Sequence, residues 1–106
     1  MAEDTVVFTD YQGRAVRLTP ERRAHVLEHP EMVDQLDRIR ETLAEPEIVV
    51  ATHADETVCV YHRHYEETPV TDKVLLVAVK LLEEDAFVLT AFFSSRRKKG
   101  KLVWQP

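Results

Sequence analysis

The chain has 106 residues, of which 44% are apolar and 31% charged, enough for one small domain around a single core. This apolar fraction excludes a disordered or low-complexity chain, and the longest apolar stretch, residues 74–82, is too short to span a bilayer. The net charge of −5 disfavours nonspecific binding of nucleic acid by the molecule as a whole.

The first half of the chain predicts two short strands followed by two helices. Residues 5–18, "TVVFTDYQGRAVRL", indicate two strands joined by a Tyr-Gln-Gly turn. Thr19 is the expected N-cap of a helix that has Pro20 at its first position and that ends near His29, before the next proline. A second helix, ending near Ala44, is predicted from apolar residues that recur with a 3.6-residue period: Met32, Leu36, Ile39 and Leu43.

The second half changes to strand periodicity. The β-rich runs are residues 47–52, 57–65, 73–82 and 86–93. The short connections "HADE" and "EEDA" predict antiparallel neighbours, and the third run is apolar on both faces, which is typical of a central strand. We therefore expect a single α+β domain over residues 1–106, with two helices packed on one face of an antiparallel sheet of about four strands.

The single cysteine, Cys59, lies in the apolar stretch "TVCVY" and cannot form an internal disulfide. The N-terminus, "MAEDT", is acidic and polar and does not have the pattern of a signal peptide. Together these features predict a cytoplasmic protein in a reducing compartment, with no membrane partner.

The sequence "HVLEH" from His25 to His29 matches a zinc-protease pattern. Those enzymes need a longer helix, a further acidic ligand and a substrate cleft in a much larger chain, whereas here Pro30 follows at once. We therefore predict no metal site. The two histidines are interpreted either as a helix-end or surface pair or as groups that act on a proton or a phosphate.

The strand "VCVYHRHY" places Tyr61, Arg63 and Tyr65 on one face and His62 and His64 on the other. An arginine between two tyrosines is suited to stacking and to contact with a phosphate. The plainer interpretation is that both tyrosines pack in the core and the arginine pairs with a carboxylate. The two histidines equally suit a site or a solvent-facing position.

Lys80 and Thr90 are polar residues within apolar strands. If the hairpin turns at "EEDA", the two residues pair directly, and an ammonium group and a hydroxyl group meet on one sheet face. The alternative is that Lys80 marks the end of its strand and Thr90 is simply compatible with a strand.

Five basic residues follow the last long strand: Arg96, Arg97, Lys98, Lys99 and Lys101. The rest of the chain carries nine basic and 19 acidic side chains, so the cluster is a local exception. It is either a solvated loop or a site for an anionic group. We expect Trp104 to return to the sheet and anchor the loop, because a buried tryptophan at modest loop length fixes both ends.

Several stretches resemble the phage barnase–EndoU–colicin–RelE-like nuclease family (PBECR). They are "LTPERRAHVLEHPEM", "IRETLAEPEIV", "VYHRHY", "LLVAVK" and "FVLTAFFSSRRKKGKLVW". The resemblance extends from about Arg17 to Trp104, and its most specific parts are "HPE", the Tyr-x-Arg-x-Tyr strand and "LTAFF" followed by "KKG" and tryptophan. It implies a barnase- and RelE-like (BECR) fold with helices on an antiparallel sheet.

The resemblance also implies metal-independent RNA cleavage, without a cofactor, by attack of a 2′-hydroxyl on the adjacent phosphate. Such chemistry needs an acid, a base and cations for the developing charge. The residues that the resemblance makes candidates for catalysis are His25, His29, Arg63, Lys80 and Thr90. The candidates for RNA binding are Tyr61, Ser94, Arg96, Arg97, Lys98, Lys99 and Lys101. The protein is then a toxin-like or phage-associated effector, and a cognate antitoxin is an expected partner.

An alternative is a noncatalytic domain that binds nucleic acid or an acidic partner through its basic run, and a third is a structural protein with an incidental basic turn. The acidic body of the chain favours these alternatives, because small RNA-cleaving toxins are typically basic. The arrangement of His25, Arg63 and Lys80 separates the first two hypotheses. Convergence in one cleft favours catalysis, and scatter favours binding.

Overall fold

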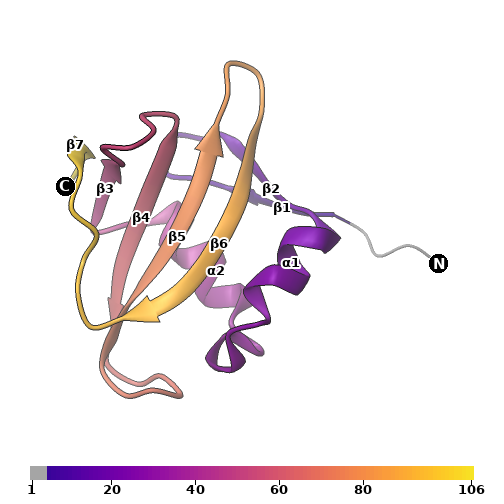
Figure 1. Ribbon diagram of the computed structural model, residues 1–106, viewed down its shortest axis with the longest axis vertical. Coiled ribbons are helices and arrows are strands. Elements are labelled where there is room, and N and C mark those ends of the chain that lie inside the picture. Colours follow the sequence, from indigo (N-terminus) through magenta and orange to yellow (C-terminus); the bar gives the residue numbers. More distant parts are fainter. Residues whose placement is uncertain (1–4) are drawn as a thin grey trace.

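The computed structural model describes residues 5–106, which form one seven-stranded mixed sheet with two α-helices and one short 3₁₀ helix (Figure 1). The strands are β1 (Val6–Thr9), β2 (Ala15–Leu18), β3 (Ile48–Ala51), β4 (Val58–Tyr65), β5 (Lys73–Leu81), β6 (Ala86–Ser94) and β7 (Lys101–Trp104). The helices are α1 (Pro20–Val26), η1 (Pro30–Met32) and α2 (Leu36–Ala44). Across the sheet the strand order is β1-β2-β6-β5-β4-β3-β7.

The α+β class is correct, but the prediction of two helices on an antiparallel sheet of about four strands is wrong. The N-terminal hairpin joins the main sheet, because β2 pairs in parallel with β6 at Arg17 and Phe87. At the opposite edge the C-terminal residues add β7, which pairs antiparallel with β3. The strands β2 and β7 have only four residues each, which is too short for their apolar pattern to show which strands they pair with. Periodicity in the sequence therefore did not predict these two pairings.

The predicted meander from β3 to β6 is present, and β5 is its central strand, as expected. Both edges of β5 are paired, with β4 and β6, and both of its faces carry buried side chains, because the helices pack on one face and a smaller apolar cluster lies on the other. Leu75 and Val77 face the main core, and Leu76 faces the other side of the sheet. This explains why the strand lacks the alternation of a half-exposed one.

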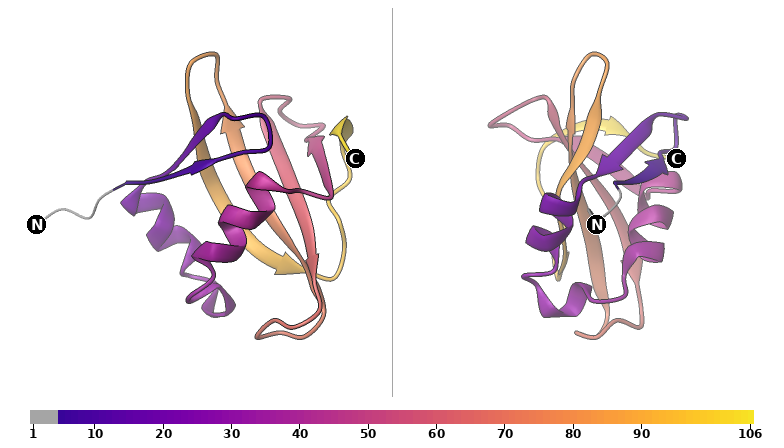
Figure 2. Two further views of the ribbon diagram at one scale, coloured as in Figure 1. Left: turned by 180° about the vertical axis from the view of Figure 1, so that it is seen from behind. Right: turned by 90° about the vertical axis from the view of Figure 1, so that its right-hand side faces the viewer.

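The helices cover one face of the sheet, as expected (Figure 2). Met32, Ile39 and Leu43 are at most 2% exposed, and Leu36 packs against them while keeping part of its surface open. The expected continuous helix through Met32 is wrong, because Met32 belongs to η1 and α2 begins only at Leu36. Asp34 takes a left-handed backbone (φ 62°), which interrupts helical geometry.

The first helix begins as predicted and ends earlier. The Thr19 hydroxyl accepts a hydrogen bond from the Arg22 backbone N–H at 3.2 Å, and Pro20 occupies the first turn. The helix ends at Val26 rather than near His29, and the following residues form a turn that leads into η1. No helix within residues 5–106 is long and apolar enough to cross a membrane.

The sheet face opposite the helices, here called the outer face, carries a small second apolar cluster. Val50, Val60 and Leu76 are at most 5% exposed and form its centre. After β6 the chain passes the ends of β5 and β4 and reaches the far edge of the sheet beside β3 (Figure 1). This crossing places the basic residues 96–101 against the outer face.

Candidate functional site

The basic segment, residues 96–101, is held against the outer face by hydrogen bonds from its backbone. The Arg96 N–H donates to the Ser94 hydroxyl at 3.1 Å. The Lys98 N–H donates to His62 Nε2 at 2.9 Å. Because the second bond fixes the middle of the segment to a residue of β4, the run of cations is not a free loop.

His62 is a fully buried acceptor beneath the segment. Its Nε2 accepts the Lys98 N–H, so the ring proton lies on Nδ1, which is 3.3 Å from the Ile48 carbonyl oxygen. Burial lowers the pKa of His62 and so favours the neutral ring, against the opposing effect of its hydrogen bond to Ile48. Sequence alternation correctly placed His62 on the face opposite Tyr61, but it did not show that this side chain is buried or what covers it.

Gly100 brings the segment into close contact with β3. A Cβ atom at this position would lie 2.3 Å from the Ala51 carbonyl oxygen and 3.1 Å from Val50 Cγ2. Only glycine allows the backbone to approach this closely. The chain then runs back along β3, and Trp104 pairs with Val49. The prediction that Trp104 returns to the sheet is therefore confirmed.

The side chains of the basic segment face solvent. Arg96, Arg97, Lys98, Lys99 and Lys101 are all exposed. The one ion pair found for them within residues 5–106 joins Arg97 Nη2 to Glu47 Oε1 at 3.8 Å. Most of the positive charge therefore has no acidic partner in this part of the chain and is available to an external anion.

A hollow of about 570 Å³ lies beside the β3–β7 edge, where α2 ends; we call it the edge hollow. Its lining includes Tyr11, Glu45, Glu47, Arg63 and Trp104. Glu47 also pairs with Arg97, so one residue at the rim of the edge hollow contacts the basic segment. One cation of the basic segment, Arg97, therefore reaches the rim of a concave surface that contains aromatic rings.

The aromatic part of the edge hollow is built on the N-terminal hairpin turn. The rings of Tyr11 and Trp104 lie 4.7 Å apart, and the Tyr11 ring meets Tyr61 edge-on at 5.9 Å. The Asp10 side chain fixes this turn, because its Oδ1 accepts hydrogen bonds from the backbone N–H groups of Gln12 and Arg14. Tyr11 was not among the predicted site residues. The only feature of the sequence that could have indicated it is its place in the Asp-Tyr-Gln-Gly turn.

Tyr61 has a structural role. Its side chain is fully buried, and its hydroxyl donates to Asp10 Oδ2 at 2.8 Å. Burial, followed by this hydrogen bond to Asp10, raises the pKa of Tyr61 well above its ordinary value. Because no part of the Tyr61 ring is exposed, it cannot make the predicted contact with nucleic acid in this structure.

Arg63 faces the helices and holds the end of α2. Its Nη1 donates to the Glu45 carbonyl oxygen at 2.6 Å, and its Nε lies 3.4 Å from Glu41 Oε1. Glu41 also accepts a hydrogen bond from the Tyr65 hydroxyl at 2.5 Å, and burial together with that bond raises the pKa of Tyr65 to about 12. The plainer interpretation, an arginine paired with a carboxylate beside a packed tyrosine, describes this contact.

Lys80 donates to Asp55 Oδ2 at 2.8 Å, and this bond is the main cause that lowers the pKa of Asp55 far below its ordinary value. The predicted pairing of Lys80 with Thr90 is wrong: Lys80 is opposite Phe87, and Thr90 is opposite Ala78. The hairpin turns one residue earlier than "EEDA", and a bulge follows Ala78, so the register shifts.

The two predicted histidines lie at the other side of the molecule, beside β6. His25 Nδ1 is 3.8 Å from Glu28 and His29 Nδ1 is 3.9 Å from Glu31, each on the partly exposed surface. The His29 ring also lies 5.8 Å from that of Phe92. Among residues 5–106 no group of three potential metal ligands occurs, and the zinc-protease pattern corresponds to no such cluster.

The predicted catalytic residues therefore do not share a cleft. Arg63 lines the edge hollow on the helix side of the sheet, while Lys80 lies on the outer face. Leu75, the pairing partner of Arg63, precedes Lys80 by five residues on β5, or roughly 16 Å along the strand. His25 is on α1 and His29 lies in the turn between α1 and η1, both at the β6 side of the molecule.

No family model matches the chain, and no curated protein or solved structure matches it either. The resemblance to the nuclease family therefore stays a prediction from short motifs.

Proposed function

We propose that this chain is a noncatalytic binding domain for single-stranded nucleic acid, RNA in the first place. The observation that carries the proposal is the basic segment. Its backbone is fixed to the sheet at Lys98 and Gly100, its cations are exposed, and one of them, Arg97, pairs with Glu47 at the rim of the edge hollow. A cationic path beside aromatic rings is the arrangement used by proteins that follow a single strand.

The cations supply the affinity. A phosphate backbone places negative charges at regular intervals, and each one neutralised releases counterions, which favours binding. Because the segment is already ordered by its hydrogen bond to His62, binding does not have to order the backbone of that loop. The acidic remainder of the chain repels the same ligand, so binding is confined to this segment.

The edge hollow favours a nucleic acid over an acidic protein. Tyr11 and Trp104 form its aromatic part, and a base stacked on such rings contributes binding energy with little dependence on sequence. Glu45 and Glu47 add acceptors that suit the amino groups of bases and that disfavour an acidic peptide at the same place.

Scatter of the predicted catalytic residues supports binding rather than cleavage. Arg63 binds the end of α2 and Lys80 binds Asp55. His25 and His29 lie beside β6, away from both of these contacts. General acid–base catalysis needs its groups within hydrogen-bond reach of one reacting centre, directly or through one water. These side chains do not meet that condition as a set.

Fluorescence anisotropy with a labelled single-stranded RNA tests the proposal. Lys98→Gln combined with Lys99→Gln should weaken binding several-fold, because two phosphate contacts are lost. The matched control neutralises Arg22 and Arg40, which are on the helices, and should leave the affinity nearly unchanged. Equal loss in both double variants would show that net charge alone, and no site, attracts the RNA.

The same RNA incubated with the protein in EDTA tests the noncatalytic part. Intact RNA after prolonged incubation is expected. Metal-independent cleavage that is lost in an Arg63→Ala variant would overturn the proposal in favour of the nuclease hypothesis. An absence of RNA binding, with capture of an acidic protein instead, would overturn the choice of ligand.

A further inference from the structure

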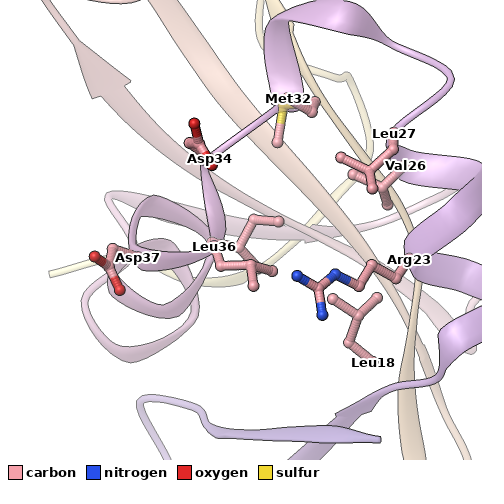
Figure 3. A pocket seen from close by; sticks show the side chains of 9 residues that line it. Leu18, Arg23, Val26, Leu27, Met32, Asp34, Leu36 and Asp37 are labelled. Atoms are coloured by element: carbon pink, nitrogen blue, oxygen red, sulfur yellow. The ribbon is translucent and has the colours of Figure 1, made fainter. Parts of the chain in front are cut away.

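A second concave site lies on the helix side of the molecule, between α1, η1 and the start of α2 (Figure 3). Its volume is about 320 Å³. Apolar side chains from four elements form its walls: Leu18, Val26, Met32, Leu36 and Ile39. A volume above about 300 Å³ with mainly apolar walls is within the range of small-molecule sites.

Arg23 gives this pocket its one inward-pointing charge. The guanidinium group points toward the space between Leu36 and Leu18 (Figure 3). No ion pair or side-chain hydrogen bond is found for it within the part of the chain that the structure describes. Asp34 and Asp37 lie at the mouth, but their carboxylates point away from Arg23 (Figure 3). A cation at an apolar wall is stabilised when an anion pairs with it.

We propose that this pocket binds a small carboxylate with an apolar body. The carboxylate would form a two-pronged pair with Arg23, whose planar fork matches that geometry. The apolar part would lie against the exposed Leu27 and the partly exposed Leu36, over a floor of buried apolar side chains. The volume equals that of on the order of ten water molecules, so the ligand has about ten non-hydrogen atoms.

This site is separate from the proposed nucleic-acid interface. It lies on the helices, whereas the basic segment crosses the outer face of the sheet. No residue lines both this pocket and the edge hollow. The two proposals can therefore fail independently.

The probe for the experiment is octanoate, followed by amide chemical shifts of the ¹⁵N-labelled protein. We expect saturable shifts at the backbone of Val26, Met32 and Leu36, with half-saturation in the millimolar range or below. Octanamide has the same chain without the charge and cannot form the ion pair, so it should bind at least about 10-fold more weakly.

Two neighbouring arginines provide a matched pair of variants. Arg23→Gln should weaken octanoate binding about 10-fold or more, while Arg22→Gln, which removes the same charge but lines a different hollow, should not. Equal weakening in both variants would overturn the proposal, as would the absence of saturable shifts around the pocket in the wild type. Octanamide binding as tightly as octanoate would also overturn it.

Discussion

Replacing Gly100 with alanine tests the contact that fixes the basic segment. The added Cβ would lie 2.3 Å from the Ala51 carbonyl oxygen, a backbone atom that cannot rotate away, and 3.1 Å from Val50 Cγ2. Inserting one carbon atom into a packed site typically costs about 1–3 kcal/mol. The strand β7 and the basic segment can move more easily than β3, so we expect them to separate from it.

Urea unfolding and amide hydrogen exchange measure this effect. We expect lower stability by about 1–3 kcal/mol and faster exchange of the Lys98 N–H, which bonds to His62. Gly13→Ala is the control: it strains a left-handed backbone (φ 81°) but meets no atom within 4 Å. Unchanged protection of Lys98 in the Gly100 variant, with stability within about 0.5 kcal/mol of wild type, would refute the contact.

Three further predictions concern the core and the buried histidine. Tyr61→Phe removes a bond to the buried Asp10 carboxylate and should cost about 1.5–3 kcal/mol by urea unfolding; an unchanged midpoint would contradict the bond. The fold lowers the pKa of His62, so the folded state binds fewer protons than the unfolded state, and stability should fall as pH drops below about 6.5. His62→Gln should reduce this loss of stability at acid pH. An unchanged dependence of stability on pH would show that other groups cause the loss. Ile39→Ala should cost about 2–5 kcal/mol and Leu36→Ala clearly less, because only the first side chain is fully buried; equal losses would show a different helix face.

Local sequence signals predicted the parts of the fold that local chemistry determines. Thr19 and Pro20 start α1 because a side-chain cap and a fixed φ favour a helix start at that point. Alternation in β4 placed Tyr61 and His62 on opposite faces. The aromatic character of Trp104 indicated that the chain would return to the sheet.

Features set by tertiary contacts were missed. The parallel pairing of Arg17 with Phe87 joins segments that are far apart in sequence, and no periodicity reports it. The break before α2 depends on the left-handed backbone of Asp34. The hairpin register depends on where the turn closes and on the bulge after Ala78, which shift Thr90 away from Lys80.

The candidate site shows the same division. The basic run is evident in composition, but its attachment through Lys98 to a buried histidine depends on the path of the chain across the sheet. Tyr11 joins Trp104 only because the turn of the N-terminal hairpin reaches across the sheet, past Tyr61 of β4, to the opposite edge at β7. Arg63 suited phosphate binding by residue type, yet the end of α2 occupies its guanidinium group.

The salt dependence of RNA binding tests the central claim most directly. About four cations of the basic segment are free of ion pairs within residues 5–106, which predicts a slope near −3 for log affinity against log salt concentration. In the variant that combines Lys98→Gln with Lys99→Gln, the slope should flatten by about 1.4. A slope near zero for the wild type, or the same slope in the variant, would contradict binding of nucleic acid by this segment.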